Sequence, residues 1–332
     1  MNTTAKEITF DKWGVCNFCR EYEVNNFKRI WEKEGLDNLV ANMKKGAPFS
    51  CLIGLSGGVD SSYALHLLVS LGLKPLCFSI DNGWNMREAD ENIMRLVEGL
   101  QVPFYRYTIN LQTFKELQIA FIKSGTANIE IPTDHILMAS SYEMARQNGI
   151  RYIISGGNLA TESIMPASWG YQARDLRFLK GIYQRFTGKP LRGLPTMSLL
   201  NWMVARFIRR ISIVNLLDYF EYNREEAIAL LSEKYGYKPY GDKHCESKFT
   251  QWFQNYYLIT FFGIDKRKAH YSSLINSKQM TRDQALEKMK EPLTYYPIID
   301  VQGTFVPHLY TEYKNSELWW NLFGKIYHIW KS

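Results

Sequence analysis

The residues best suited to chemistry stand in one short stretch, Ser56-Gly57-Gly58-Val59-Asp60-Ser61-Ser62. The stretch follows an apolar run, Cys51 to Leu55, that is typical of a buried strand, and an apolar-periodic helix comes after it. Two glycines let the backbone approach an anion closely, and the free N–H groups at the start of the helix favour negative charge. The stretch therefore predicts a phosphate-binding loop between a strand and a helix.

Two common nucleotide loops are excluded. The Gly-x-x-x-x-Gly-Lys-Ser/Thr pattern is absent, because Gly188-Lys189 runs into Pro190, and so is Gly-x-Gly-x-x-Gly. An ordinary strand-to-helix turn is the plain alternative, which a six-residue match in the right context disfavours. The loop instead resembles the PP-loop of the ATP pyrophosphatases. That resemblance implies a grip on the β- and γ-phosphates of ATP, which is cleaved to AMP and pyrophosphate.

The composition is that of a globular protein of one large or two medium domains, with 332 residues and a hydrophobic fraction of 46%. No apolar run has the length of a spanning helix, and Met1–Asp11 shows no signal-peptide pattern, so we expect a cytoplasmic location. Five cysteines do not form the pattern of a disulfide framework. Cys51 and Cys77 lie inside apolar strands and are expected to be buried thiols.

The net charge of +7 is concentrated in one segment. Nine basic residues and one acid, Asp175, lie between Arg174 and Arg210. A solvated basic face is the plain interpretation, and an anionic substrate, a partner surface, a membrane surface or RNA are the sharper ones. Apolar residues alternate with the charges there, so we expect a peripheral membrane or protein contact through 174–210 and no nucleic-acid partner.

Alternating strands and helices in residues 48–165 predict an α/β fold with a parallel doubly wound sheet. The resemblance of the loop implies that this sheet is of the PP-loop (adenine nucleotide alpha hydrolase-like) type. Residues 1–47 are expected to form a leader, and residues 166–332 a mainly helical substrate or partner region. The expected strands are Cys51–Leu55, Pro75–Ile80, Phe104–Ile109 and Arg151–Ile154. The expected helices are Asn25–Met43, Ser62–Leu71, Arg87–Leu100, Leu111–Lys123, Thr133–Asn148, Leu199–Leu217, Arg224–Glu233, Phe249–Phe262, Thr281–Met289 and Leu318–Trp330.

Polar and glycine residues gather where the expected strands end. They are Ser56, Asp81, Asn110 and the run Gly156-Gly157-Asn158. Ligands of parallel sheets bind at the carboxyl ends of the strands, so this clustering predicts a single nucleotide site.

Cys16 and Cys19 form a lone Cys-x-x-Cys pair in the leader. A closed zinc site needs four ligands, and only His244 and Cys245 are distant candidates of suitable chemistry. The pair is therefore a weak signal for zinc.

Three further stretches resemble the N-acetyl sugar amidotransferase family, in addition to the loop. They are the opening Ile8 to Cys19, the stretch Tyr240 to Thr250 and the stretch Phe262 to Ile275. The resemblance covers nearly the whole chain, but the additional Cys-x-x-Cys that is common before the opening is missing. It implies an enzyme of surface-polysaccharide and nonulosonic-acid pathways that converts an acetamido group on a sugar into an acetamidino group, using ATP and ammonia.

The implied chemistry assigns roles to residues. Asp60 is expected to bring Mg²⁺ to the phosphates, and Lys243 and His244 to contact the leaving phosphate or to act as acid or base, oriented by Glu246. A surface loop with ordinary charges is the alternative for His244. The expected phosphate-binding residues are Ser56, Gly57, Gly58, Ser61 and Ser62, and the expected adenosine-binding residues are Ile80, Asp81, Gly156, Gly157 and Asn158.

Three other functions stay open: a PP-loop tRNA thiolase, another PP-loop amide or NMP ligase, and a non-enzymatic nucleotide sensor. No cysteine is placed as an evident sulfur carrier or glutaminase nucleophile. We therefore expect ammonia to come from a separate polypeptide. The family resemblance implies glutaminase and cyclase-like subunits as that source, and a nucleotide- or lipid-linked acetamido sugar as the substrate.

Overall fold

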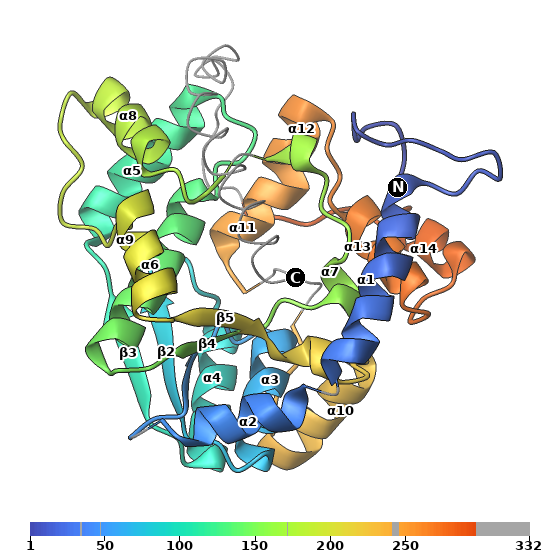
Figure 1. Ribbon diagram of the computed structural model, residues 1–332. Helices are drawn as coiled ribbons and strands as arrows, with labels where there is room; N and C mark the ends of the chain where they lie inside the picture. The colour runs from blue at the N-terminus through green and yellow to red at the C-terminus, as the bar shows by residue number, and fades with distance from the viewer. Residues whose placement is uncertain (34, 47, 171, 241–245, 297–332) are drawn as a thin grey trace.

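The computed structural model describes residues 1–33, 35–46, 48–170, 172–240 and 246–296. Five parallel strands form one sheet in the order β3-β2-β1-β4-β5 (Figure 1). This confirms the predicted α/β fold class. The strands are β1 Cys51–Gly54, β2 Pro75–Asp81, β3 Phe104–Thr108, β4 Tyr152–Ser155 and β5 Ser212–Asn215.

Helices make up most of the remaining described chain. Those of the first half are α1 Asn17–Lys33, α2 Leu36–Lys44, α3 Val59–Ser70, α4 Arg87–Leu100, α5 Leu111–Ser124 and α6 Ile131–Gln147. The next are α7 Leu159–Glu162, η1 Ala167–Trp169, α8 Leu176–Thr187, α9 Leu199–Met203, η2 Val204–Ile208, η3 Leu216–Tyr219 and α10 Arg224–Tyr235. The last are α11 Lys248–Trp252, η4 Phe253–Tyr257, α12 Leu258–Phe262, α13 Arg267–Asn276 and α14 Arg282–Lys288.

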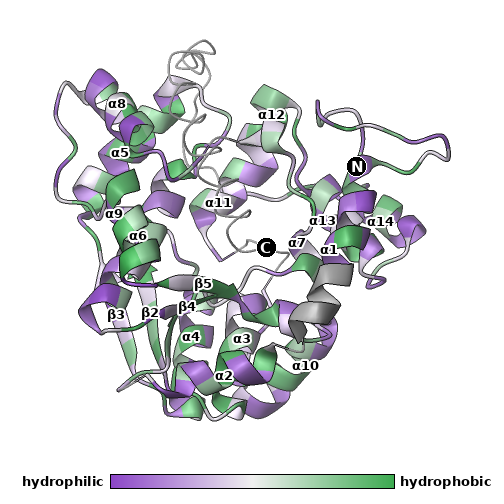
Figure 2. Cartoon of the chain, in the orientation of Figure 1, coloured by the Kyte–Doolittle hydropathy of each residue, from purple (hydrophilic) through white to green (hydrophobic). Residues whose placement is uncertain are grey.

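Helices cover both faces of the sheet. Successive side chains of a strand point to opposite faces, so neighbouring residues of one strand pack in different clusters. Cys51 and Ile53 of β1 pack in a cluster with α3, α4 and α10, while Leu52 between them packs with α6 and Trp202. Hydrophobic residues, green in Figure 2, are prominent on α3 and α6, which flank the sheet. Burial on both sides explains why the strands β1 and β2 are short apolar runs.

Strand β5 corrects the helix predicted at Leu199–Leu217. The chain there is helical through η2, and then Arg210 adopts a left-handed conformation, with φ of 57°. Residues 212–215 next pair with β4, with Ser212 opposite Tyr152. A left-handed arginine carries no sequence signal comparable to glycine, so the apolar periodicity alone predicts a helix that continues past Arg210.

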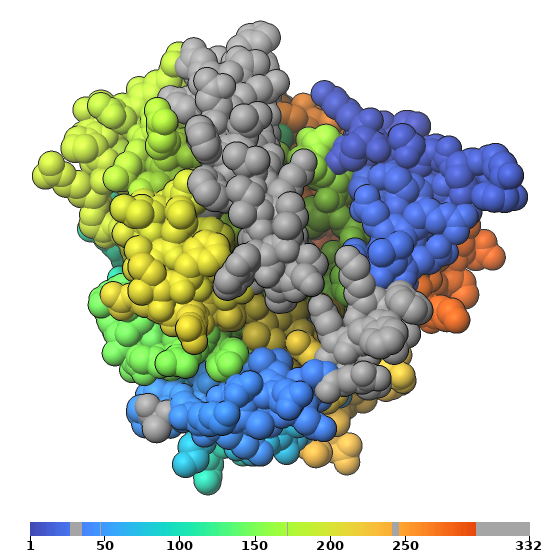
Figure 3. All heavy atoms as spheres, viewed as in Figure 1, coloured from blue at the N-terminus to red at the C-terminus, as the bar shows by residue number. Residues whose placement is uncertain are grey.

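The single helix predicted at Asn25–Met43 is also wrong, because the structure has two helices separated near Gly35. Glycine inside a helix costs about 1 kcal/mol relative to alanine, which favours a break there. The first residues of the chain lie beside the segment of α13 and α14 (Figure 3), and the N-terminal ammonium donates to Ser272 Oγ at 2.6 Å.

The other predicted helices differ in their limits. The helix predicted at Arg87–Leu100 matches α4, and Thr281 with Gln284 forms the predicted capping box of α14. The predicted helix Phe249–Phe262 is present with a π-helical turn, η4, in its middle. The predicted helix Leu318–Trp330 lies outside the described residues, and the division of the chain at residue 165 stays a prediction. No helix in the described part of the chain has the length and apolarity needed to cross a membrane.

Candidate functional site

The loop after β1 is closed by its own side chains. Gly57 has φ of +82°, and the Gly58 N–H donates to Ser56 Oγ at 3.2 Å. Ser61 Oγ donates to the Gly58 carbonyl at 3.2 Å, and it lies 3.3 Å from Ser56 Oγ. Ser62, the next residue of α3, is buried. The first N–H groups of a helix have no acceptor inside it. Those of α3 follow this loop directly, so the loop and the helix start together can bind an anion.

Neighbouring backbone packs so tightly on the loop that it needs its glycines. A Cβ atom on Gly57 would lie 2.3 Å from the Ala89 carbonyl oxygen on α4. A Cβ atom on Gly156, after β4, would lie 3.0 Å from the Ser61 nitrogen. The structure therefore brings the end of β4 directly against the loop, as the clustering of glycines predicted.

Asp60 lies in the first turn of α3 and accepts a hydrogen bond from the Tyr222 hydroxyl. Tyr222 is buried, and burial together with the Asp60 carboxylate raises the pKa of its phenol, so that it stays a donor. The sequence analysis did not find Tyr222. It comes from the segment before α10, far along the chain, and an isolated tyrosine carries no motif.

Glu246 also reaches the loop. A Cβ atom on Gly58 would lie 2.4 Å from Glu246 Oε1, so this carboxylate lies directly over the loop. The backbone around it is held by the turn after β2, since the Met86 N–H donates to the Glu246 carbonyl at 2.8 Å. The Lys248 N–H likewise donates to the Trp84 carbonyl at 3.0 Å. Glu246 had been expected to orient Lys243 or His244, which both lie outside the described residues.

The other predicted nucleotide-binding residues lie near the same edge of the sheet. Asp81 ends β2, and its Oδ1 accepts from the Gly83 N–H at 3.0 Å, while Ile80 before it is half-buried. Gly157 follows Gly156, and its N–H donates to Ser155 Oγ at 3.0 Å. Asn158 is buried and caps α7 by accepting from the Thr161 N–H at 2.9 Å. Asn158 thus has a structural task, and the contacts of all these residues with a nucleotide stay predictions.

The Cys16 and Cys19 thiols lie 3.5 Å apart at the start of α1. Burial and the neighbouring Cys16 raise the pKa of the Cys19 thiol. In the described parts of the chain, no group of three or more His, Cys, Asp or Glu side chains is placed to hold a metal ion. The pair therefore gains no further support as a zinc site.

A second group of charges was missed by the sequence analysis. Glu130 before α6, Asp134 on α6 and Lys266 before α13 interact electrostatically, and we call these three residues the charged cluster. Burial, and then the Asp134 carboxylate, raise the pKa of Glu130 to about 7. Burial also lowers the pKa of Lys266. These side chains come from distant segments, so only the fold brings them together.

Replacing Glu130 by glutamine is expected to stabilise the protein at pH 8. A carboxyl whose pKa is raised from 4.5 to about 7 contributes stability below pH 4.5 and loses it as the pH rises through 7. The ionised form at pH 8 therefore costs about 3 kcal/mol, which the neutral amide removes. Urea unfolding of the wild type and of Glu130→Gln at pH 5 and pH 8 measures the difference.

Glu143→Gln on the same helix is the matched control for this stability prediction. Glu143 is exposed and pairs with Arg146, which lowers its carboxyl pKa, so its replacement should not stabilise the protein at pH 8. If Glu130→Gln lost stability equally at both pH values, the charge of Glu130 would not be the cause.

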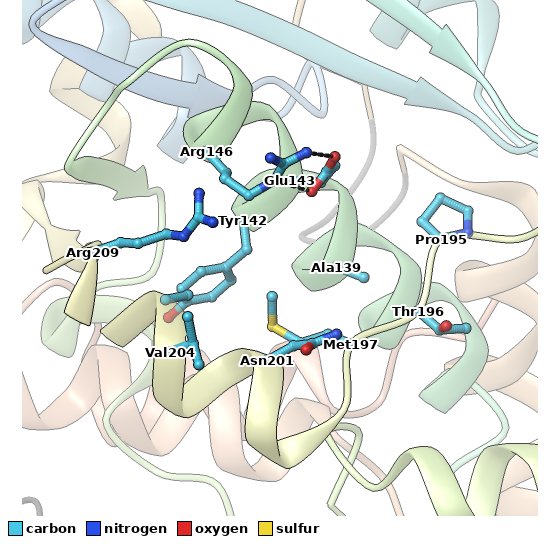
Figure 4. A pocket seen from close by; sticks show the side chains of 11 residues that line it. Ala139, Tyr142, Glu143, Arg146, Pro195, Thr196, Met197, Asn201, Val204 and Arg209 are labelled. Carbon is cyan, nitrogen blue, oxygen red and sulfur yellow. Dashed lines mark hydrogen bonds and ion pairs between the residues drawn. The ribbon is translucent and has the colours of Figure 1, made fainter. Parts of the chain in front are cut away.

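A separate pocket of about 380 Å³ lies between α6 and the α9–η2 segment (Figure 4). Tyr142, Asn201 and Arg209 line it, and Arg146 forms its ion pair with Glu143 at the rim. No residue of the loop at 56–62 lines this pocket. It borders the basic segment 174–210, where Leu200 and Ile208 are exposed. The contact predicted through this segment stays a prediction.

Comparison with known proteins supports the assignment of the C-terminal part. Residues 246–302 match the family model described as LPS biosynthesis protein WbpG-like, C-terminal domain. An uncharacterized protein of Methanocaldococcus jannaschii is 29% identical over 161 residues, or 47% of this chain and 56% of that protein. A probable tRNA sulfurtransferase of Clostridium botulinum is 23% identical over 140 residues, or 41% of this chain and 36% of that protein. The chain thus spans 56% of the length of the first of these curated relatives and 36% of the length of the second.

Two solved structures show weak likeness over most of their length. NMN synthetase from Francisella tularensis is 16% identical with a TM-score of 0.30, covering 68% of this chain and 98% of that chain. NH3-dependent NAD synthetase from Campylobacter jejuni, in complex with the nitrate ion, is 16% identical with a TM-score of 0.32, covering 67% of this chain and 99% of that chain. At these scores neither likeness carries an argument.

The parallel sheet in the order 3-2-1-4-5, with its glycine loop after the central strand β1, is the α/β arrangement that the loop and the alternation of strands and helices predicted. Residues 246–302, in the C-terminal part of the chain, are similar to the WbpG-like C-terminal domain of LPS biosynthesis proteins. This match agrees with the family resemblance that the motifs in this part of the chain indicated.

Proposed function

We propose that this chain is an ATP-dependent amidotransferase of bacterial surface-polysaccharide synthesis, including O-antigen. It adenylates the acetamido oxygen of an N-acetylated sugar, releases pyrophosphate and replaces AMP with ammonia to give an acetamidino sugar. One observation carries the proposal: the WbpG-like domain begins on the phosphate loop, with Glu246 over Gly58 and Ser247 paired with Asn85. The segment that matches the LPS biosynthesis family therefore lies beside the loop where the phosphates of ATP would bind.

The loop supplies the nucleotide site in this proposal. Ser56, Gly57, Gly58, Ser61 and Ser62 surround the pyrophosphate part of ATP, and the helix start of α3 faces its charge. The ends of β2 and β4, at Ile80–Asp81 and Gly156–Asn158, receive the adenosine. Fixed N–H groups and positioning then stabilise the charge that develops on the phosphates as pyrophosphate leaves.

Magnesium fits the residues that are present. Mg²⁺ usually keeps several waters and binds one or two carboxylates together with phosphate oxygens. Asp60 and Glu246 both act electrostatically on Tyr237, whose pKa burial raises to about 12, so both carboxylates lie within electrostatic reach of one side chain. Without a cation they would repel the phosphates of ATP. Asp60 and Glu246 would hold the ion, which would neutralise phosphate charge when bound.

The chemistry of the substrate explains why ATP is needed. An amide carbonyl is a poor electrophile, and adenylation of its oxygen makes an imidate with AMP as leaving group. Ammonia then forms the new C–N bond, and the C–O bond to AMP breaks with its electron pair on the phosphate. Lys243 and His244, beyond the described residues, are proposed to contact that phosphate or to transfer protons.

A tRNA thiolase is the second candidate function, because one partial relative is a probable tRNA sulfurtransferase. Sulfur transfer needs an accessible, reactive cysteine. Cys51 and Cys77 are fully buried in β1 and β2, and burial raises the pKa of both thiols, for Cys77 to about 12. Transfer of ¹⁵N from ammonium into a sugar amidine, followed by mass spectrometry, supports the amidotransferase. Sulfur transfer into tRNA supports the thiolase.

The purified chain should use ammonium salts but not glutamine. A glutaminase needs an exposed nucleophilic cysteine with a base beside it, and neither Cys51 nor Cys77 is accessible. We therefore propose that ammonia comes from separate glutaminase and cyclase-like subunits. Product formation with ammonium chloride and with glutamine at equal concentration measures this. Release of glutamate by the chain alone, stopped by one Cys→Ala change, would contradict it.

A further inference from the structure

Gln279 bridges the backbone on either side of Asn223. Its side-chain Nε2 donates to the Tyr222 carbonyl at 2.9 Å, and its Oε1 accepts from the Arg224 N–H at 3.0 Å. These two bonds fix the orientation of the amide, because a flipped amide would set its NH₂ group against an N–H and its oxygen against a carbonyl. Gln279 therefore holds the main chain from Tyr222 to Arg224 at both ends.

The main chain that Gln279 holds leads into the helix α10. Arg224 is the first residue of that helix, so its N–H has no acceptor inside the helix. Gln279 supplies this acceptor, while the Asn223 side chain accepts from the next two N–H groups. The bridge thus fixes the place where the chain passes from Tyr222 into α10.

Gln279 is itself held by the end of α13. Its N–H donates to the Leu274 carbonyl at 2.9 Å, and the Lys278 N–H donates to the Ile275 carbonyl at 3.1 Å. Together with the left-handed conformation of Lys278, with φ of 61°, these bonds form the Schellman motif that ends many helices. The motif sets the direction in which the chain leaves α13, so it determines where the Gln279 side chain can reach.

Tyr222 connects this bridge to the phosphate loop. Its hydroxyl donates to Asp60 Oδ1, and its ring packs against the Tyr63 ring with 5.7 Å between the ring centroids. Asp60 and Tyr63 are three positions apart in α3, so they lie on one face of that helix. Tyr222 is only 4% exposed, so its side chain has little freedom to leave Asp60 unless its main chain moves. The main chain that Gln279 fixes therefore determines where the donor to Asp60 lies.

We propose that Gln279 is a positioning residue of the nucleotide site, which acts through Tyr222 to hold the Asp60 carboxylate in the orientation that binds magnesium on the phosphates of ATP. The inference rests on the proposed function and adds to it a residue from the segment that matches the LPS biosynthesis family. Magnesium demands near-ideal octahedral geometry, so its affinity depends on how precisely a carboxylate is held. Loss of a hydrogen bond to a metal ligand typically weakens metal binding about ten- to a hundredfold. Gln279 acts one residue further away, so we expect a smaller effect.

Gln279→Met tests the inference. Methionine is unbranched and of similar length, but it makes neither of the two hydrogen bonds. In pyrophosphate release, the magnesium concentration for half the maximal rate should rise about fivefold, while the rate at saturating magnesium stays within about twofold. A merely structural role of Gln279 would lower the stability of the protein without changing its magnesium dependence.

Gln284→Met is the matched control. Gln284 is a second glutamine of the same segment whose Oε1 accepts from a backbone N–H, that of Thr281 at 2.8 Å. This bond belongs to the capping box of α14 and does not lead to the phosphate loop. The same substitution at this position should leave the magnesium dependence within about twofold of the wild type.

Gln279→Glu is a second variant, which does not depend on how methionine packs. The carboxylate keeps an acceptor for the Arg224 N–H but sets an oxygen, in place of the NH₂ group, against the Tyr222 carbonyl. We expect it to weaken magnesium dependence at least as much as Gln279→Met. Magnesium dependence like that of the wild type in Gln279→Glu would contradict the bridge to Tyr222.

Binding of manganese gives a readout that does not depend on the sugar reaction. Mn²⁺ serves as the probe because it takes the same oxygen ligands as Mg²⁺, and its free concentration is measured by electron paramagnetic resonance. The nucleotide is an ATP analogue with a methylene group between the α- and β-phosphorus atoms, which cannot be cleaved to AMP and pyrophosphate. The Kd of Mn²⁺ in this complex should rise about fivefold in Gln279→Met and stay within about twofold of the wild type in Gln284→Met.

A double variant tests the route through Tyr222. Tyr222→Phe should also raise the Kd of Mn²⁺, and adding Gln279→Met to it should raise the Kd no further, because both residues act through Asp60. An unchanged Kd in Gln279→Met, or losses that add in the double variant, would overturn the inference.

The inference and the proposed function fail in different ways. Weaker manganese binding in Gln279→Met, without sugar-dependent pyrophosphate release by the wild type, would remove the amidotransferase and keep Gln279 as a positioning residue. Amidine formation by the wild type, with equal manganese binding in Gln279→Met and Gln284→Met, would keep the enzyme and remove the role of Gln279. A wild type that binds no manganese with the nucleotide analogue would overturn the inference as well.

Discussion

Asp60→Asn should lower sugar-dependent pyrophosphate release at least about a thousandfold while leaving the fold intact. Asp60 lies in the first turn of α3, which is proposed to face the phosphates, and it is one of the two carboxylates proposed to hold magnesium. Asparagine keeps the size of the side chain and can still accept from Tyr222, so the loss reports the charge. Pyrophosphate is measured in a coupled assay, and thermal unfolding checks the fold.

Tyr222→Phe is the companion variant. It removes the hydroxyl that donates to Asp60 and leaves the carboxylate in place, so a loss of about tenfold is expected. Ser56→Ala should also abolish pyrophosphate formation, since Ser56 Oγ accepts the Gly58 N–H and faces the anion site. Turnover near that of the wild type in Asp60→Asn or Ser56→Ala would remove the assignment of the loop.

Gly57→Ala should disrupt the loop far more than Gly58→Ala. At Gly57 a Cβ atom would lie 2.3 Å from the backbone oxygen of Ala89, and φ of +82° adds strain. Backbone of α4 cannot yield locally, so the free energy of unfolding should fall by about 2–4 kcal/mol. At Gly58 the obstacle is the Glu246 carboxylate at 2.4 Å, and a flexible side chain can move away. Urea unfolding of both variants gives the comparison.

The same pair of variants tests the position of Glu246. Gly58→Ala should keep near wild-type stability and weaken ATP turnover, because it displaces Glu246 from the loop. The double variant Gly58→Ala with Glu246→Gln should then lose little further activity, as expected for residues acting on one another. Equal destabilisation by Gly57→Ala and Gly58→Ala would show that the loop packs differently from this account.

The sequence predicted what short-range patterns determine. The loop at 56–62 and the helix α4 follow from local glycine spacing and apolar periodicity, and the strand ends followed from the βα alternation. Strand β5 was not found, because its four residues follow a left-handed Arg210 that no residue type announces. The sheet therefore includes a strand from beyond residue 165.

The remaining site residues depend on the fold. Tyr222 meets Asp60 across 162 positions of sequence, and Thr250 meets Glu130 across 120. A single tyrosine or glutamate has no periodicity or spacing from which such a contact follows. Asn158 illustrates the opposite case, because a polar residue at a strand end was predicted for the nucleotide and in the structure caps α7.

The central claim is that ATP is cleaved to AMP and pyrophosphate on an acetamido sugar. The direct measurement is pyrophosphate release from ATP by the purified chain in the presence of ammonium chloride. Parallel reactions contain nucleotide-linked acetamido sugars, lipid-linked acetamido sugars or unmodified tRNA as the substrate. The account predicts pyrophosphate and AMP in equal amounts with an acetamido sugar, absent when the sugar carries a free amine, and none with tRNA. Pyrophosphate release with tRNA alone would contradict it.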